Sequence, residues 1–124
     1  MKIQPDFISA QSISGYGPGW VAIGQEKIST SVVIGSSGER FDWDCQCFED
    51  LRQAHFAQLA AMNTELVIFG SGKCLRFPQA DWIKPLIKKQ IGIETMDTQA
   101  ACRTYNILAG EGRHVALALL LEAP

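Results

Sequence analysis

The stretch Leu66-Val67-Ile68-Phe69-Gly70-Ser71-Gly72 decides the fold class of this chain. An extended segment from Leu66 to Gly70 is apolar on both faces, which is typical of a strand covered on two sides in a parallel sheet. Gly70 and Gly72 flank Ser71 and allow the backbone to turn where the strand ends. Neighbouring parallel strands need a crossover connection, so helices are expected on either side of this segment.

The residues around this strand have those helical patterns. Apolar residues at helical spacing predict an amphipathic helix from Phe48 to Met62, and His55 lies on its apolar stripe as a hydrogen-bonded core histidine rather than a catalytic base. Asp81 offers an N-cap for a helix reaching about Gln90, with Pro85 in its first turn. The later elements are a strand at 91–96, a helix at 98–111 capped by Asp97 and Thr98, and a buried strand at 115–121. Residues 48–124 are therefore αβαβαβ, and right-handed crossovers place the strands at 66–70 and 91–96 side by side and parallel.

Residues 1–47 have a different pattern, with turn signals such as Gly15-Tyr16-Gly17-Pro18-Gly19 between short runs. This spacing predicts an antiparallel meander. The clearest alternation runs from 28 to 34, with Thr30 on the buried face and Ser31 on the opposite one, and such strands bury one face only. No linker separates the two regions. We therefore predict one α/β domain over residues 1–124, with a small antiparallel β element beside a mixed central sheet flanked by helices.

The apolar positions of the central layer predict its core. Val67, Phe69, Leu108, Leu117 and Leu119 should form the heart of this layer. Truncating Leu108 or Leu119 to Ala is expected to cost about 2–5 kcal/mol for that reason.

The charge of the chain is nearly balanced, with 11 Lys and Arg residues against 13 Asp and Glu residues. Nucleic-acid binding is not indicated, because it depends on clustered positive charge. One local basic cluster, with Asp81 as its only acid, contains Lys73, Arg76, Lys84, Lys88 and Lys89. We find no secretory signal pattern and no apolar run of the roughly 20 residues that a membrane span requires. The sequence therefore predicts a cytoplasmic protein without a transmembrane segment.

A ligand crevice is one candidate site. If the strands at 66–70 and 91–96 are parallel, their carboxyl ends share the sheet edge at which open α/β sheets bind ligands. The turn at Gly70, Ser71 and Gly72 and the helix start at Asp97 and Thr98, with Arg103 on the same helix, would meet there and cradle an anion. Alternatively, the glycines only supply backbone freedom. The glycine spacing matches neither a dinucleotide fingerprint nor a P-loop.

Three surfaces are candidates for binding a protein partner. They are a helix face with Arg103 and Asn106, a basic patch of Lys84, Lys88 and Lys89, and a turn carrying Tyr16 and Trp20. A solvated helix face explains the polar residues equally well, and cross-strand packing explains the two aromatic residues.

The sequence contains no recognisable catalytic or metal-binding constellation. Ser71 has glycine directly on both sides, which is not the spacing of a nucleophile elbow. Cys45 and Cys47 lack the second pair of ligands that zinc requires. Cys102 is either a thiolate favoured by the adjacent Arg103 or a small buried apolar residue. We expect four unbridged cysteines, no metal and no cofactor, and the pattern argues against an enzyme.

Several short motifs together resemble a known family. They are Val67 to Gly72, Phe77-Pro78, Gly92 to Thr98, Ala101 to Asn106 and Glu111 to Arg113. On these residues the chain resembles the widespread domain of unknown function that includes mitochondrial complex I assembly factor three. The resemblance implies a three-layer fold in which a small β element packs beside a mixed central sheet carrying helices. It implies no established enzymatic activity, cofactor or substrate.

The expected function is a non-catalytic interaction or assembly module with a protein partner, aiding the assembly of a membrane or respiratory complex. The resemblance and the lack of a catalytic constellation both favour it. The alternative is a small-molecule or anion-binding protein, conceivably an enzyme, that uses the crevice between the Gly70–Gly72 turn and the Asp97 helix start.

Overall fold

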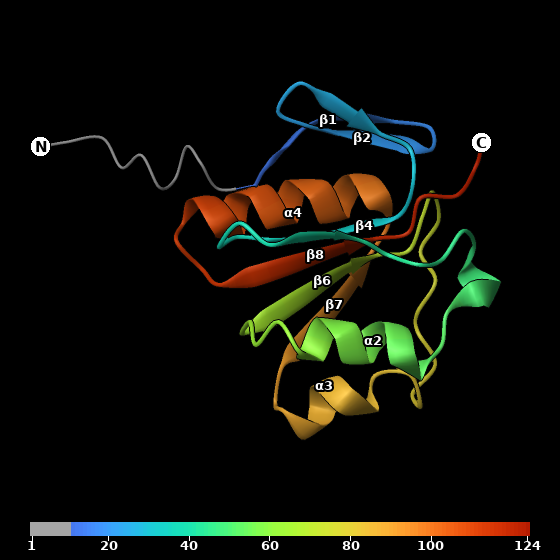
Figure 1. Ribbon diagram of the computed structural model, residues 1–124, viewed down its shortest axis with the longest axis vertical. Helices are drawn as coiled ribbons and strands as arrows, with labels where there is room; N and C mark the ends of the chain where they lie inside the picture. The colour runs from blue at the N-terminus through green and yellow to red at the C-terminus, as the bar shows by residue number, and fades with distance from the viewer. Residues whose placement is uncertain (1–10) are drawn as a thin grey trace, which may run out of the picture.

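The computed structural model describes residues 11–124 of the chain (Figure 1). Its strands are β1 (Ile13–Gly17), β2 (Trp20–Ile23), β3 (Glu26–Ile28), β4 (Val32–Gly35), β5 (Arg40–Asp42), β6 (Leu66–Gly70), β7 (Gly92–Met96) and β8 (Val115–Leu119). Its helices are the short 3-10 helix η1 (Phe48–Asp50) and the α-helices α2 (Gln53–Ala60), α3 (Lys84–Lys88) and α4 (Thr98–Gly110). The first ten residues of the predicted meander lie outside the described part of the chain.

The central sheet has five strands in the order β5-β4-β8-β6-β7. Strand β6 pairs in parallel with β7 on one side and with β8 on the other. Strand β4 pairs with β8 antiparallel, so the sheet is mixed. The predicted parallel pairing of the strands at 66–70 and 91–96 is therefore confirmed.

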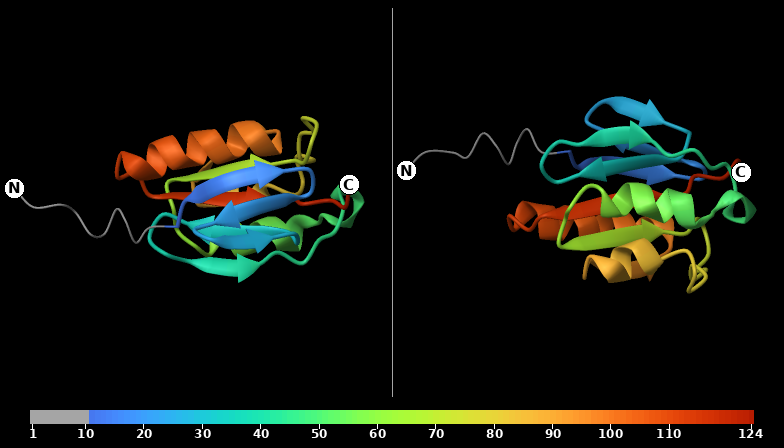
Figure 2. Two further views of the ribbon diagram at one scale, coloured as in Figure 1. Left: turned by 90° about the horizontal axis from the view of Figure 1, so that it is seen from above. Right: turned by 60° about the horizontal axis from the view of Figure 1, so that its bottom comes forward.

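The protein has three layers, and this sheet is the middle one (Figure 2). Helices α2 and α3 cover one face, where Phe56 and Leu86 pack against Val67 and Phe69. Helix α4 and the three-stranded sheet β1-β2-β3 together cover the other face. The predicted α/β architecture, with a small antiparallel sheet beside a mixed central sheet, is confirmed. No helix within residues 11–124 has the length and apolar character to cross a lipid bilayer.

The core consists of two apolar clusters on opposite faces of the central sheet, not of the single cluster that the sequence predicted. Val67 and Phe69 belong to the cluster under α2 and α3, whereas Leu117 and Leu119 belong to the cluster under α4. The side chains divide in this way because successive residues of a strand point to opposite faces. Leu108 is only half-buried at the margin of the α4 cluster, so its predicted place in the heart of the core was wrong.

The predicted helix from Phe48 to Met62 is interrupted. Helix α2 begins only at Gln53, after η1 and two extended residues. The Arg52 N–H, which would bond to Phe48 in a continuous helix, instead donates to His55 Nδ1 at 3.0 Å. His55 Nε2 lies 2.6 Å from the Asp44 carbonyl oxygen, so both ring nitrogens are hydrogen-bonded. His55 is thus a satisfied histidine, as expected, although it is only half-buried.

Helix α3 is also shorter than predicted. Ile83 occupies its N-cap position without a capping side chain, and Pro85 lies in the first turn as expected. Asp81 was predicted as the cap but instead forms an ion pair with Lys84 at 3.0 Å. A turn across residues 79–82, closed by a bond from the Trp82 N–H to the Gln79 carbonyl, separates Asp81 from the helix start.

The alternating segment at 28–34 is not one strand. It divides into β3 of the small sheet and β4 of the central sheet. At this break two residues differ from the prediction, since Thr30 is exposed and Ser31 is buried, whereas Ile28, Val32 and Ile34 are buried as predicted. The Ser31 hydroxyl accepts a hydrogen bond from the Leu121 N–H at 2.9 Å, and the backbone carbonyl of Ser31 accepts one from the Trp43 N–H. Strand β4 is then covered on both faces because it lies inside the three-layer stack.

Candidate functional site

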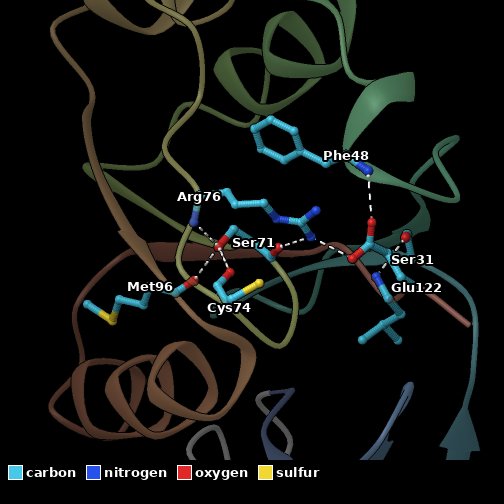
Figure 3. Close-up of polar contacts among 8 residues, drawn as sticks. Ser31, Phe48, Ser71, Cys74, Arg76, Met96 and Glu122 are labelled. Carbon is cyan, nitrogen blue, oxygen red and sulfur yellow. Dashed lines mark hydrogen bonds and ion pairs between the residues drawn. The ribbon is translucent and has the colours of Figure 1, made fainter. Parts of the chain in front are cut away.

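The three parallel strands end at the same edge of the central sheet. Strand β6 continues into Ser71 and Gly72, β7 into Asp97, and β8 into residues 120–122. Ser71 is fully buried, and its hydroxyl donates to the Cys74 carbonyl at 2.8 Å and accepts the Arg76 N–H at 2.9 Å (Figure 3). This hydroxyl therefore organises the loop that follows β6.

The Arg76 side chain folds back onto the protein. Its Nη2 donates to the Ser71 carbonyl at 2.7 Å and to Glu122 Oε1 at 2.5 Å, and its guanidinium lies over the Phe48 ring (Figure 3). The hydrogen bond with Glu122 raises the pKa of Arg76. The other Glu122 oxygen accepts the Phe48 N–H at 3.0 Å. One carboxylate thus connects the loop after β6, the residues after β8 and η1.

In this loop a charged side chain points inward and two apolar side chains are exposed to solvent, whereas loops usually expose their polar side chains. Leu75 and Phe77 flank Arg76 in a part of the loop without helix or strand, and Arg76 is the least exposed of the three residues. Because Arg76 turns inward, Leu75 and Phe77 turn outward and are 52% and 69% exposed. We call them the Leu75–Phe77 pair.

A cavity of about 490 Å³ lies beside this loop, at the carboxyl ends of the parallel strands. Gly72, Asp97 and Thr98, three of the predicted crevice residues, line it. Its other walls come from the 16–19 turn, Lys73, Gln99 and residues 120–124. Gly70, Ser71 and Arg103 do not line it.

Much of the hydrogen-bonding capacity at the start of α4 is used within the chain. The Thr98 N–H donates to the Gly72 carbonyl at 2.8 Å, and the Ala100 N–H donates to Asp97 Oδ1 at 2.9 Å. Asp97 is thus the N-cap that the sequence predicted. These bonds join the helix start to the loop after β6.

The two glycines of the predicted crevice have different structural roles. Gly72 has a φ of +106°, a backbone conformation that residues other than glycine rarely adopt. Gly70 lacks such a φ, but a Cβ there would lie 2.6 Å from Leu119 Cδ2 and 3.2 Å from Ala101 Cβ. Gly70 therefore lets α4 approach the sheet closely.

Comparison with known families places these features in context. The model of a family described as "Protein of unknown function (DUF498/DUF598)" matches residues 13–120. The chain belongs to this family. A solved crystal structure of a Bordetella parapertussis protein is similar to it, with a TM-score of 0.86, 32% identity, and coverage of 92% of this chain and 98% of that one. The solution structure of a Bordetella pertussis protein, described as a Mth938-like domain, has a TM-score of 0.84, 26% identity, and coverage of 99% and 91%.

Relatives of the DUF498 chain carry different descriptions. An uncharacterised Rhodobacter capsulatus protein is 32% identical over 94% of this chain and 90% of the relative. NADH dehydrogenase (ubiquinone) 1 alpha subcomplex assembly factor 3 of Bos taurus is 28% identical over 63% of this chain and 44% of the relative. The 13 kDa major membrane protein of Francisella tularensis is 26% identical over 58% of each. The matched part is thus less than two thirds of the length of the last two relatives.

The predicted helix face at Arg103 and Asn106 holds the small sheet. The Asn106 side chain accepts the Ile13 N–H at 2.9 Å and donates to the Ile13 carbonyl at 2.8 Å. Arg103 Nη1 donates to the Tyr16 hydroxyl at 3.2 Å. Trp20, on the next strand, lies under the Lys27 ammonium group. The Asn106 amide is therefore engaged within the chain, whereas Arg103, Tyr16 and Trp20 keep part of their surface accessible.

The predicted lysine patch is on the outer side of α3. Lys84 pairs with Asp81, and Lys89 Nζ donates to the Ala60 carbonyl at 3.3 Å and to Asn63 Oδ1 at 3.1 Å. Lys88 forms no ion pair within residues 11–124. The patch therefore keeps its positive charge although two of its members have structural contacts.

All four cysteines are unpaired in the structure, and their surroundings differ. Burial raises the pKa of the Cys102 thiol to about 12, despite the neighbouring Arg103. Burial also raises the pKa of Cys45 to about 12. The structure thus favours the apolar alternative for Cys102. Cys74, in contrast, is exposed in the loop after β6.

Cysteine labelling should follow this difference. With a disulfide reagent at mildly alkaline pH, we expect the exposed Cys74 to react first, because the thiolate is the reacting form. The half-exposed Cys47, whose pKa is raised by desolvation, should react more slowly, and Cys45 and Cys102 at least about a hundredfold more slowly than Cys74. Cys74→Ser should remove the fast phase, and non-reducing intact mass should show no disulfide. A fast phase that persists in Cys74→Ser would contradict the assignment.

The Leu75–Phe77 pair and the contact between Arg76 and Glu122 were not predicted. The alternation of Leu75, Arg76 and Phe77 is visible in the sequence, but it does not reveal which face is buried. That depends on Glu122, which is 46 residues away from Arg76 along the chain.

Proposed function

We propose that this chain is a non-catalytic interaction module of the assembly-factor type, and that it holds a protein partner through the Leu75–Phe77 pair. The observation that carries the proposal is the reversed loop, in which Arg76 points inward and two large apolar side chains point outward. The similarity of this chain to NADH dehydrogenase (ubiquinone) 1 alpha subcomplex assembly factor 3 supports a role in building a multi-subunit complex. We extend that role to a membrane or respiratory complex.

The loop has the properties of a binding anchor. Aromatic and other large side chains that enter a pocket on a partner provide most of the free energy of typical interfaces. Contacts from Ser71, Arg76 and Glu122 already order the loop, so binding would lose less conformational entropy than it would for a mobile segment. The surrounding polar side chains are engaged in holding this shape, which also favours an interaction role over a catalytic one.

Replacing the pair should strongly weaken partner binding without unfolding the protein. In Leu75→Ser/Phe77→Ser, we expect the melting temperature to stay within about 2 °C of wild type, because exposed substitutions change stability little. Recovery of the partner in quantitative affinity capture from native lysate should fall at least about tenfold. The purified partner should then show the same loss by calorimetry.

Ile107→Ser is the matched control, because Ile107 is an equally exposed apolar residue on α4. It should retain wild-type capture. If no captured protein is lost in Leu75→Ser/Phe77→Ser, or if Ile107→Ser loses the same proteins, the pair is not the binding site.

The cavity at the ends of the parallel strands supports a second candidate, a small-molecule or anion-binding protein. Its volume of about 490 Å³ is in the range of small-ligand sites. A melting-temperature rise with one member of an anion and nucleotide panel, lost in Lys73→Glu, would support this function. No shift across the panel would reject it.

A further inference from the structure

The outer side of the α2 and α3 layer is basic. We define the α2–α3 face as residues 52–62 and 81–90, which contain Arg52, Lys84, Lys88 and Lys89 against Asp81 alone. The other residues of the chain include seven basic and twelve acidic ones. A chain with a net charge of −2 therefore has one face with a charge of +3 and a remainder with a charge of −5.

Most of this positive charge is available to a partner. Lys84 is paired with Asp81, which is part of the same face. Lys89 donates only to neutral oxygens and so keeps its charge. Neither Arg52 nor Lys88 forms an ion pair within the described residues.

An exposed aliphatic residue lies among these charges. Ile87 is 61% exposed, one turn after Lys84 and next to Lys88. With Gln53 and Pro85 it borders a shallow depression between the start of α2 and the outer side of α3. Ala54 and Ala57 add exposed apolar surface on α2.

We propose that the α2–α3 face binds an anionic lipid surface. Each Lys or Arg residue near an anionic membrane raises the partition coefficient by about fivefold, and an aliphatic side chain at the centre can enter the interfacial region. A nucleic acid would meet Ile87 with its phosphates and gain nothing from it, so the combination favours lipid. Lysine suits headgroup contact because it is a compact charge on a flexible stem.

Glu26 and Glu111 do not oppose this orientation strongly. Helix α4 and the small sheet, which carry Glu26 and Glu111 at their ends, are on the other side of the central sheet (Figure 2). Packed layers are about 10 Å apart, and salt screens exposed charges over about 8–10 Å. A membrane that touches the α2–α3 face therefore senses the four basic residues of the face, together with Asp81 and with Glu49 and Asp50, which precede α2.

This inference goes beyond the proposed function, because it concerns a different surface and requires no protein partner. The loop with the Leu75–Phe77 pair leads directly into α3 (Figure 1). Binding to lipid would thus hold the Leu75–Phe77 pair near a membrane, and the pair would remain accessible to a protein partner.

Vesicle sedimentation with the full chain at low salt tests the inference. We expect wild type to bind vesicles made of equal parts phosphatidylglycerol and phosphatidylcholine, and to bind phosphatidylcholine vesicles at least about tenfold more weakly. Lys84→Glu/Lys88→Glu should lower partitioning onto the anionic vesicles by about tenfold or more. Ile87→Ser should lower it by about threefold, and added salt should weaken binding in every case.

Lys27→Glu/Arg103→Glu is the matched control, because it changes the net charge equally on the opposite side of the central sheet, outside the face. It should reduce partitioning by less than about twofold, since its charges are remote from the lipid. Circular dichroism confirms that each variant is folded. Equal losses in both double variants, equal binding to phosphatidylcholine, or binding to an acidic polypeptide such as polyglutamate but to no vesicle would each overturn the inference. None of these results affects the capture experiment on the Leu75–Phe77 pair.

Discussion

Phe69→Ala is expected to lower the free energy of unfolding by about 3–5 kcal/mol, the largest single effect that we predict. Phe69 is fully buried on β6, with ring centroids 5.5 Å from Phe56 and 5.9 Å from Trp43. Trp43 and Phe56 also contact each other at 5.8 Å, so the three rings form a closed cluster. Removing the Phe69 ring would leave a cavity that the closely packed Trp43 and Phe56 side chains cannot move to fill. Urea denaturation followed by tryptophan fluorescence measures the loss.

Leu108→Ala provides the comparison for this variant. Leu108 is half-buried at the margin of the α4 cluster, so its truncation should cost about 1 kcal/mol, since the site can relax into solvent. If Phe69→Ala does not fold, Phe69→Leu keeps the measurement possible with a smaller loss. A loss for Leu108→Ala as large as that for Phe69→Ala would show that the core is centred elsewhere.

Gly70→Ala should destabilise the protein by about 1–3 kcal/mol, although alanine normally suits a strand better than glycine. The added methyl group would meet Ala101 Cβ at 3.2 Å and the buried Leu119 side chain. Helix α4 would then have to move away from β6. The measurement is again the midpoint and slope of urea unfolding.

Gly110→Ala is the matched control and should have the opposite sign. A Cβ at Gly110 meets no atom within 4 Å, and the residue ends α4 with helical geometry. Alanine there should stabilise the protein by about 0.5–1 kcal/mol, because it restricts the unfolded chain. If both glycine variants gain stability, the close approach of α4 at Gly70 is not limiting.

The two proposed surfaces suggest a division of roles within one segment. Residues 71–83 connect β6 to α3, so the apolar pair at 75 and 77 and the lysines at 84 and 88 belong to one stretch of chain. Aromatic and aliphatic anchors give a complex its lifetime, whereas exposed charges mainly accelerate and orient encounter. The vesicle and capture experiments separate these contributions.

The central layer of this protein can be predicted from local sequence pattern. Leu66 to Gly70 is apolar on both faces, short and bounded by glycine, which is the pattern of a strand covered on both sides. Asp97 begins α4 because a side-chain cap acts on the next turn of the same helix. These features depend on residues close together in the chain, so they can be inferred from local pattern.

The breaks in the predicted elements and the candidate surfaces depend on contacts between residues that are distant in the sequence. The chain divides at Ser31 because Leu121 and Trp43, which follow β8 and β5, bond to that residue. Leu75 and Phe77 point outward because Arg76 finds Glu122 at the far end of the chain. Asn106 is occupied because β1 lies against α4. Each outcome depends on a partner at least 12 residues away, and local periodicity carries no information about which distant group a polar side chain will meet.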